Sequence, residues 1–576
     1  MAPHHRPARP PRRARTGAAA ALVLLVPLLC ACAGERSSGG HLAALRDAGQ
    51  PRRIQPRLSI ALNHEACEPA PPPDAGTVPG ALCRGAGGDP DARSRAIDIQ
   101  DRARRTARAR VDPEAMRAVA LVDLLWNPGD AVRADSVVEG LEAVARLAPT
   151  ADGLADLSAA YIVRAGITGQ PGDLVAAIDA AHRALVLDPD HIGARFNAAL
   201  AEQRQALDRV AREDWDAYLA ADSGSAWAAE ARRHRDSLVV AAANSFSYLR
   251  ADSAALARRA AENPQEAREI ALDQLFPAWA DTLWAGDAAV AEDRLRRAES
   301  IGAALARRPG GDAMVADLAA AARRSPDLAP AFSSLSQGQR ARARGSYADA
   351  EAAFSAAERL AAGEPVLRTW CAYWGAVARY LRNSGDRGRS VFASLAARTD
   401  GTRYPVLAGR AYWSLTTLTG RQGDFAAAMA HAASAERLFR SAGETASAAF
   451  VHYLGAEAAW NLGDREESAR RSYRVLHDVR GFPHSMLRHN QLYVSAQAAS
   501  GAGLRHAAVR LLDESVAMMD GAPAPLRVEP LLRRAEARAA LGLGALARED
   551  LDAGAPLLDS LPDPYQQEWN RQDQRM

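Results

Sequence analysis

Cysteine and histidine are the residue types of this chain that could most readily do chemistry. The 576 residues include 5 cysteines and 13 histidines. Cys371 with His431 or His452 could form a thiol–imidazole pair, in which the imidazole removes the thiol proton and leaves a nucleophilic thiolate. All three lie in stretches of helical periodicity, where packing against a neighbouring helix accounts for them. We therefore expect no catalytic residue among them.

Metal and cofactor chemistry is disfavoured by the motifs and by the composition. No His-Glu-x-x-His and no paired-Cys zinc motif occurs, and His484 and His489, five residues apart, do not share a helix face. All 71 Lys+Arg residues are arginine. Without lysine there is no P-loop, no kinase-type ATP site and no Schiff-base chemistry. The sequence predicts a protein that is not an enzyme and has no metal, cofactor or small-molecule substrate.

The first 32 residues are predicted to be an export signal. A basic stretch is followed by the short apolar run 18–29, which is too short to span a bilayer. The run ends in Leu29-Cys30-Ala31-Cys32, which resembles a bacterial lipobox and implies lipidation of Cys32. The alternatives are an ordinary cleaved signal with an incidental cysteine, or a twin-arginine signal at Arg12-Arg13. We expect an exported, membrane-anchored lipoprotein on the periplasmic or cell-surface face.

Removal of this signal changes the charge of the chain. The full sequence carries a net charge of +2. Five arginines leave with the signal, so the remaining chain has 66 basic and 69 acidic residues, a net charge of −3. A chain with this balance has no net-charge argument for binding nucleic acid, and we expect no nucleic-acid partner.

Residues 33–112 are rich in Gly, Pro, Ser and Arg, and we predict a disordered or weakly ordered tether. Cys67 and Cys83 flank a Pro/Gly-rich loop that is flexible enough to close. Because export favours disulfides, the two residues are a candidate disulfide. The arginine-dense stretch 93–110 is interpreted as a solvated helix face, since it lacks aromatic residues for base stacking.

From about residue 113 onward the pattern is helical. Alanine makes up more than a fifth of the chain and aromatic residues only 6%, which favours helix over strand. A glycine followed by a small residue at +5 recurs eight times. Six of these glycines are spaced by 38 to 40 residues, and the eight are Gly172, Gly286, Gly345, Gly385, Gly423, Gly463, Gly503 and Gly542. The period predicts stacked helix–turn–helix units, each turning at a glycine.

These units resemble the tetratricopeptide repeat (TPR). The matching residues are clearest in Gly345-Ser346-Tyr347 with Ala350, Phe354 and Ala357, and in Gly423-Asp424-Phe425 with Ala428, Ala432 and Ala435. The resemblance implies an all-α fold, an α-α superhelix or TPR-like solenoid. We expect irregular repeats over 113–335, regular repeats of about 40 residues over 336–560, and a polar tail over 561–576.

A narrower resemblance concerns Trp215-Asp216-Ala217-Tyr218-Leu219, with Asp222, Ser225, Trp227 and Glu230-Ala231-Arg232. This segment is similar to the N-terminal repeat region of bacterial CHAT-domain proteins. In that family the repeats precede a caspase-like cysteine peptidase, which we do not find here. The resemblance implies an alternative function as the regulatory or sensor portion of a CHAT-type peptidase system whose catalytic domain is missing or on another chain.

The expected binding surface is the concave groove that the first helix of each TPR lines. Counting back from the turn glycines to the positions that line the groove in the family gives Arg379, Arg382, Arg410, Trp413, Tyr453, Glu457, Asn490, Tyr493 and Gln497. Arginine mixed with tryptophan and tyrosine is typical of interface hot spots. The first hypothesis is therefore a lipid-anchored scaffold that binds a protein or peptide in the cell envelope.

Overall fold

The computed structural model describes most of the chain after the expected signal. The described residues are 40–48, 50–60, 62–63, 67, 77–83, 90–238, 252–383, 388–399, 401, 403–480, 486–519 and 524–559. Cys32, the lipobox and the expected polar tail lie outside these residues. We call the described part of residues 40–238 the N-terminal module.

The N-terminal module contains nine helices and one pair of two-residue parallel strands. The elements are α1 (His41–Asp47), β1 (Gln50–Pro51), β2 (Leu62–Asn63), α2 (Pro90–Ala109), α3 (Pro113–Trp126), α4 (Ala131–Leu147), α5 (Ala151–Thr168), α6 (Gly172–Leu187), α7 (Ile192–Arg204), α8 (Asp208–Ala221) and α9 (Ala226–Asp236).

The rest of the described chain is helical throughout. It contains α10 (Ser253–Glu262), α11 (Pro264–Ile270), the π-helical turn η1 (Ala271–Leu275), α12 (Phe276–Trp284), α13 (Ala288–Ala306), α14 (Met314–Arg324), the 3₁₀ turn η2 (Pro326–Leu328), α15 (Ala329–Ala343), α16 (Tyr347–Leu360), α17 (Pro365–Asn383), α18 (Arg389–Thr399), α19 (Pro405–Arg421), α20 (Phe425–Ser441), α21 (Thr445–Asn461), α22 (Arg465–Asp478), α23 (Met486–Gly501), α24 (Arg505–Met518), α25 (Ala524–Ala540) and α26 (Gly544–Asp559).

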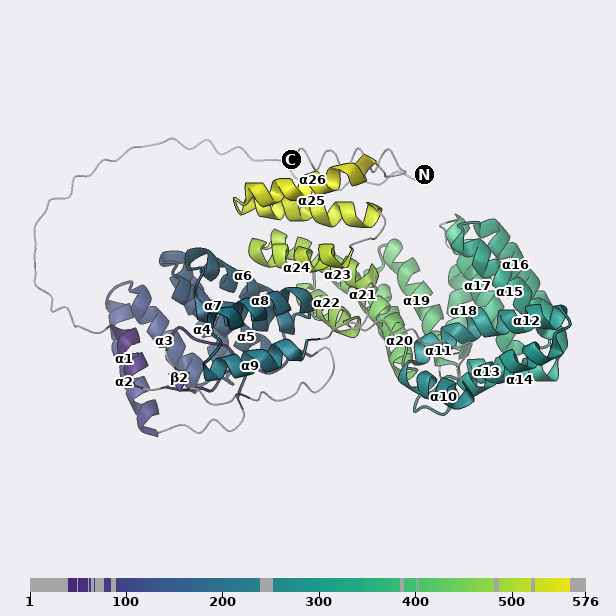
Figure 1. Ribbon diagram of the computed structural model, residues 1–576, viewed down its shortest axis with the longest axis horizontal. Coiled ribbons are helices and arrows are strands. Elements are labelled where there is room, and N and C mark those ends of the chain that lie inside the picture. The colour runs from purple at the N-terminus through teal and green to yellow at the C-terminus, as the bar shows by residue number, and fades with distance from the viewer. Residues whose placement is uncertain are drawn as a thin grey trace, which may run out of the picture. The chain divides into compact units, whose positions relative to one another are not determined.

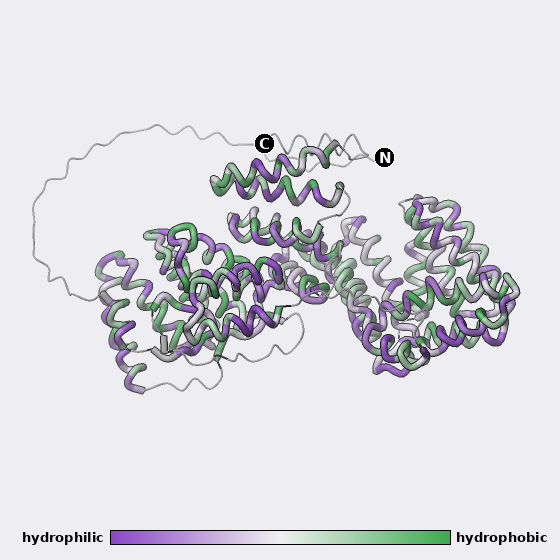
Figure 2. Tube along the Cα trace, viewed as in Figure 1, coloured by the Kyte–Doolittle hydropathy of each residue, from purple (hydrophilic) through white to green (hydrophobic). Residues whose placement is uncertain are grey.

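These helices form the all-α, TPR-like solenoid that the repeats predict. Most helices pack mainly on the next one along the chain, both within pairs such as α15–α16, α19–α20 and α25–α26 and between pairs, as in α16–α17 and α20–α21 (Figure 1). Figure 2 shows that most of these helices carry both apolar and polar stretches. Stacking buries the apolar face of each pair against its neighbours.

Most of the predicted turn glycines have the conformation that only glycine adopts easily. Gly423 has φ 81° and Gly463 has φ 84°, and the aspartate that follows each one caps the next helix through its carboxylate. Before α6 the prediction is wrong by three residues, because Gly169 (φ 69°) makes the turn and Gly172 begins the helix.

The small residue at +5 packs as expected in most repeats, and Ala177, Ala350 and Ala508 are fully buried. The repeat after Gly385 differs. Gly385 itself lies outside the described residues, while the predicted packing residues Ser390 and Ala397 are exposed. Helix α18 instead buries Phe392, Leu395 and Ala396, so its register is shifted relative to the other repeats.

The expected tether needs the largest correction. Residues 33–112 include the helices α1 and α2, and between them Arg52, Ile54 and Ile60 are at most 2% exposed. The few apolar residues of this Pro-rich stretch join the core of α3–α9. Local composition does not predict this packing, because the partners of the stretch lie a hundred or more residues away along the chain.

The two largest cores do not divide where the sequence changes from irregular to regular repeats. One core combines the N-terminal module with residues of α22, α23 and α24. The other runs from Leu256 to Leu418 and crosses the expected boundary at 335/336. The helices α22–α24 therefore pack both on their sequence neighbours and on the module, and α24 contacts α6 and α8 (Figure 1).

Candidate partner-binding surface

The predicted groove residues on α17 face the wrong helix. Arg379 donates from Nε to Oε1 of Glu351 at 2.9 Å, and Nη1 of Arg382 lies 2.9 Å from Oε2 of the same carboxylate. Glu351 belongs to α16, the second helix of the preceding pair. These two arginines therefore tie α17 to α16, and they do not line the surface formed by the first helices of the pairs.

The length of α17 explains the error. Both α17 and α19 begin with a proline, Pro365 and Pro405, but α17 has 19 residues and α19 has 17. Counting back from the turn therefore places α17 two residues out of register. Aligned on their first residues, Arg410 and Trp413 of α19 correspond to Trp370 and Tyr373 of α17.

Aromatic and guanidinium groups recur on four first helices, α15, α17, α19 and α21, in two contacting sets that meet on α19. We call the two sets together the aromatic–arginine stripe, and its members are Arg342, Trp370, Trp374, Arg410, Trp413, Phe450 and Tyr453.

Short contacts connect the members within each of the two sets. The guanidinium carbon of Arg342 lies 4.7 Å from the ring centre of Trp374, and that of Arg410 lies 5.5 Å from Trp370. Further along, the rings of Trp413 and Phe450 are 4.8 Å apart. Cation–π stacking of this kind holds a guanidinium over a ring while its outer N–H groups stay available.

Two donors in the stripe have no acceptor. Nε1 of Trp374 and Nε of Arg410 are buried without a hydrogen-bond partner. Among the described residues, no carboxylate lies within ion-pair distance of Arg342 or Arg410, whereas many other half-buried arginines are paired. A buried donor without an acceptor costs about 1–3 kcal/mol, and a bound group that supplies an acceptor would recover that cost.

Two carboxylates, on α11 and η1, lie within electrostatic reach of Arg410. Glu269 and Asp273 are solvent-exposed, yet burial by surrounding protein raises the pKa of both, and the charge of Arg410 opposes that rise. Glu269 and Asp273 are thus accessible to solvent and yet partly desolvated by the protein around them, as side chains on a recessed surface are. Asp273 sits in the π-helical turn η1, and such turns are frequent at functional sites.

The remaining predicted groove residues fall into two groups. Tyr453 is half-buried against Phe450, and burial raises its pKa, while Glu457, one turn further along α21, is exposed. On α23, Asn490 is exposed and Tyr493 donates to Glu529 of α25. Gln497 donates to the hydroxyl of Tyr493 at 2.7 Å.

Tyr493 and Gln497 line a hollow of about 280 Å³ with Arg533 and Glu536. The predicted residues of α19, α21 and α23 lie on the first helices of their pairs, those of α17 pair with Glu351 of α16, and their part in partner binding stays a prediction. Sequence reasoning missed Arg342, Trp370, Trp374 and the π-helical turn. The proline that begins α17 lies two residues further from its turn glycine than the proline that begins α19. This difference was the signal in the sequence that could have located Trp370.

The side chains that could take part in catalysis or metal binding are engaged in packing and ion pairs within the protein. Cys371 is buried, and burial raises the pKa of its thiol. Among the described residues one group, His182, Glu202 and Asp214, has the spacing of metal ligands. Arg510 lies 2.6 Å from Glu202 and 3.2 Å from Asp214, so a guanidinium already neutralises these carboxylates. In the part of the chain that the structure describes, no helix combines the length and the apolar character needed to cross a membrane.

Comparison with known proteins yields fold-level similarities at low sequence identity. No protein-family model and no curated protein matches the chain. Among solved structures, BtubC (BKLC) from P. vanneervenii is 15% identical, with 41% of this chain and 93% of that chain covered and a TM-score of 0.32.

Two further structures cover more of the chain. Yeast Tom70 is 14% identical over 84% of this chain and 95% of its own, with a TM-score of 0.30. The APC/C hetero-tetramer Cut9-Hcn1 is 14% identical over 83% of this chain and 93% of its own, with a TM-score of 0.33. TM-scores this low carry no argument, so the assignment of the fold rests on the helix pairs themselves.

Proposed function

We propose that this protein is a lipid-anchored, non-enzymatic TPR-like scaffold that binds a protein or peptide segment in the bacterial cell envelope. The observation that carries the proposal is the aromatic–arginine stripe. It combines Trp, Tyr and Arg, the residue types that dominate binding energy at interfaces, with buried donors that have no acceptor among the described residues.

The position of the stripe supports binding of an extended ligand. Its members come from four successive first helices, so a bound segment would contact several repeats at once. The guanidinium groups of Arg342 and Arg410 would donate hydrogen bonds to carboxylate or carbonyl oxygens of the ligand. The rings of Trp374, Trp413 and Tyr453 would cover its apolar side chains.

A comparative pull-down from envelope extract tests this surface. We expect the double change Arg410→Ala and Tyr453→Ala to remove the bound partner, because it deletes one guanidinium and one ring of the stripe. The matched control is Arg379→Ala with Arg382→Ala, which changes two arginines of α17 that face α16. If the double variant Arg410→Ala with Tyr453→Ala still binds every partner, or if the two double variants behave alike, the stripe is not the binding surface.

The lipid anchor is a separate part of the proposal and rests on the sequence Leu29-Cys30-Ala31-Cys32. Several acyl chains on one cysteine bury enough CH₂ groups to hold a protein stably at a membrane. We expect incorporation of radiolabelled palmitate that the change Cys32→Ser abolishes. Absence of label on the unmutated protein would remove the anchor and leave the binding surface untouched.

The alternative, a regulatory portion of a CHAT-type peptidase system, rests on the segment from Trp215 to Arg232. In the structure the rings of Trp215, Tyr218 and Trp227 surround Phe196 at centroid distances of 5.0, 5.4 and 5.3 Å. Packing accounts for these residue types without a peptidase, so we favour the scaffold. A downstream reading frame that encodes a caspase-like domain would reverse this preference.

A further inference from the structure

The corner between α7 and α8 has an unusual backbone and is fully buried. Ala206 has φ 61° and is the one non-glycine residue with positive φ in the described chain. This left-handed conformation costs a residue with a β-carbon about 1–2 kcal/mol and persists only where the surroundings hold it. Ala206 and its neighbour Leu207 have no exposed surface, so the corner is held in place from outside.

The groups that hold it come from α22–α24, almost 300 residues further along the chain. Nη2 of Arg488 donates to the carbonyl of Ala206 at 2.7 Å, and Nε of Arg480 donates to Asp208 at 2.7 Å. The carboxylate of Glu514 accepts from the amide N–H groups of Arg209 and Val210, at 3.2 Å each. The corner is therefore the point at which the N-terminal module docks on α22–α24.

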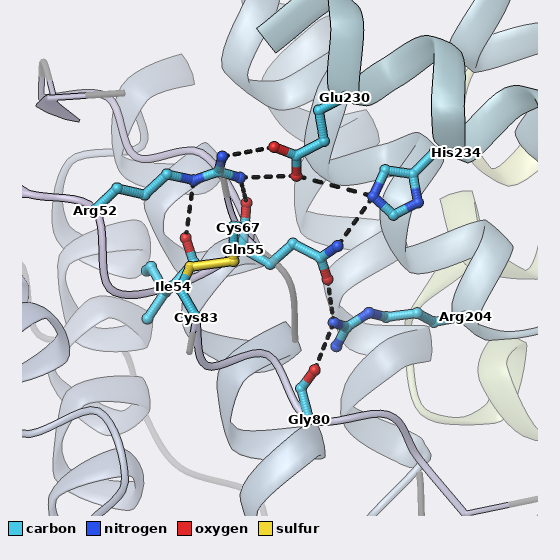
Figure 3. Close-up of a disulfide and its surroundings, with 9 residues drawn as sticks. All are labelled: Arg52, Ile54, Gln55, Cys67, Gly80, Cys83, Arg204, Glu230 and His234. Carbon is cyan, nitrogen blue, oxygen red and sulfur yellow. Dashed lines mark hydrogen bonds and ion pairs between the residues drawn. A yellow bond between two sulfur atoms is a disulfide. The ribbon is translucent and has the colours of Figure 1, made fainter. Parts of the chain in front are cut away.

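A disulfide lies on the other side of this corner. Cys67 and Cys83 are joined across 16 residues of sequence. The segment 78–83 that ends at Cys83 pairs with residues 53–55: Cys83 N donates to Arg53 O at 3.0 Å, and Gln55 N donates to Ala81 O at 2.8 Å. Figure 3 shows the disulfide beside Ile54, with Arg204 reaching the carbonyl of Gly80.

Arg204, the last residue of α7, connects the disulfide-closed segment to the docking corner. Its guanidinium donates to Pro79 O at 3.1 Å and to Gly80 O at 3.0 Å, and it also donates to Gln55 Oε1. Burial lowers the pKa of Arg204 to about 10. Its own carbonyl lies 3.0 Å from Nε2 of His477 in α22.

The segment also touches α22 directly. Val78 packs in one buried cluster with Leu174 of α6 and Tyr473 of α22. The backbone of Pro79 to Ala81 lies so close to α5 that a β-carbon on Gly166 would come within 2.9 Å of Pro79 O and Ala81 N. Disulfide, segment 78–83, Arg204 and α22 are thus in unbroken contact.

We propose that the Cys67–Cys83 disulfide is a redox site that controls docking of the N-terminal module on α22–α24. In the oxidised chain the closed loop holds the carbonyls of Pro79 and Gly80 against Arg204. Reduction lets segment 78–83 sample more conformations. The buried guanidinium then loses its acceptors, and the corner releases α22–α24.

The reductant is a protein or small-molecule dithiol. Cys67 is 4% exposed and Cys83 is more exposed, so the attacking thiolate bonds to the sulfur of Cys83 and Cys67 leaves as thiolate. The second thiol of the reductant then attacks the mixed disulfide and releases Cys83. The dithiol gives two electrons and two protons, leaves as a disulfide, and the chain gains two thiols.

Hydrogen–deuterium exchange on the full chain tests this proposal. We compare the oxidised protein, the same protein with dithiothreitol, and the double variant Cys67→Ser with Cys83→Ser. The expected result is a roughly tenfold or greater rise in amide exchange over 204–210, 473–480 and 505–518, with residues 405–441 unchanged. Removal of dithiothreitol and reoxidation restores the slow exchange. If only residues 50–83 respond, or if 405–441 respond equally, the proposal fails.

A variant of the connecting residue separates control of docking from general loss of stability. Arg204→Met keeps the disulfide and the length of the side chain. It should raise exchange over 473–480 and 505–518 without reductant, and dithiothreitol should then add little. Arg195→Met is the matched control, since Arg195 lies on the same helix and donates to Pro189 instead. The role of Arg204 would be contradicted if the two variants showed equal rises in amide exchange. It would also be contradicted if reduction still gave the full rise in exchange in Arg204→Met. Should the variants fail to fold, the reduction of the unmutated protein decides alone.

Discussion

The N-terminal module and the repeats α15–α21 are both built from helices, but they are held together differently. In the repeats, most contacts join helices that are close in sequence, such as Gly409 beneath Phe439, and the buried pair of Arg268 and Glu444 is a distant exception. In the module, polar ties join residues far apart in sequence, such as Arg52 with Glu230 across 178 positions and Ser59 with Asp156 across 97. Local contacts make units that can loosen one at a time, whereas distant ties make a unit that fails as a whole.

The largest expected effect breaks one of the distant ties. Arg52 donates to Glu230 at 2.6 and 2.9 Å, and its guanidinium stacks on Trp227 at 3.8 Å. Glu230→Ala leaves a fully buried guanidinium without its counter-charge, and we expect a loss of about 3–5 kcal/mol in urea unfolding. Glu351→Ala, which breaks half-exposed pairs between α16 and α17, is the control, and an equal loss there would remove the distinction.

The second prediction concerns pH and the docking of α22 on the module. His477 faces the ring of Tyr473, the carbonyl of Arg204 and the charges of Arg480, Asp208 and Arg488, and burial lowers its pKa to about 4 from the ordinary 6.5. The neutral imidazole is therefore the form that the folded state favours. The contribution of neutral His477 to the free energy of unfolding is complete above pH 6.5. It is lost as the pH falls toward 4, and the loss reaches up to about 3 kcal/mol.

The measurement is the difference between the unmutated protein and His477→Gln, by urea unfolding from pH 7 to pH 4. Taking the difference is necessary because Asp214, whose pKa is raised to about 7, acts in the opposite direction over the same range. The variant should lose less stability on acidification than the unmutated protein. Parallel curves would show that His477 does not titrate across this window.

The third prediction concerns a local contact of the repeats. A β-carbon on Gly409 would lie 2.8 Å from Cε1 of the buried Phe439. Overpacking of this kind costs about 1–3 kcal/mol, partly offset by about 1 kcal/mol from the better helix propensity of alanine. Gly409→Ala should raise hydrogen exchange in α19 and α20 alone. Gly420→Ala, whose β-carbon would meet Ala428 at an ordinary 3.9 Å, should be neutral or stabilising. A change in exchange that reaches the module would contradict local coupling.

The smallest effect is expected at an exposed ionic cluster. Arg323 lies 3.0 Å from Glu292 and 2.5 Å from Glu299, and its side chain is 42% exposed. Solvent-screened pairs contribute about 0.2–1 kcal/mol, so Arg323→Ala should lower the thermal midpoint only slightly. The effect should fade in high salt. A loss comparable to that of Glu230→Ala would show that exposure does not separate the two classes of ion pair.

Much of the fold follows from the sequence pattern. The regular spacing of Gly345, Gly423, Gly463, Gly503 and Gly542 locates the turns of the repeats, because a left-handed turn residue is strongly biased toward glycine. The count back from the turn glycine gives the same register in first helices of the usual length, as in α19, and the groove positions themselves stay a prediction. The count is out of register in α17, since two extra residues in one helix shift it without changing the pattern.

The sequence by itself determined what local chemistry specifies: helical hairpins, their turns, the small residues that let helices approach, and the absence of lysine-dependent chemistry. Only the tertiary structure decided that residues 41–110 belong to a folded module, that Arg342 and Trp374 extend the stripe, and that α22–α24 return to the corner at Ala206. The physical reason is distance along the chain. Helix and turn preferences act within a few residues, whereas the partners of Arg52, Arg204 and Glu514 are set by packing of segments far apart in sequence, which no local pattern encodes.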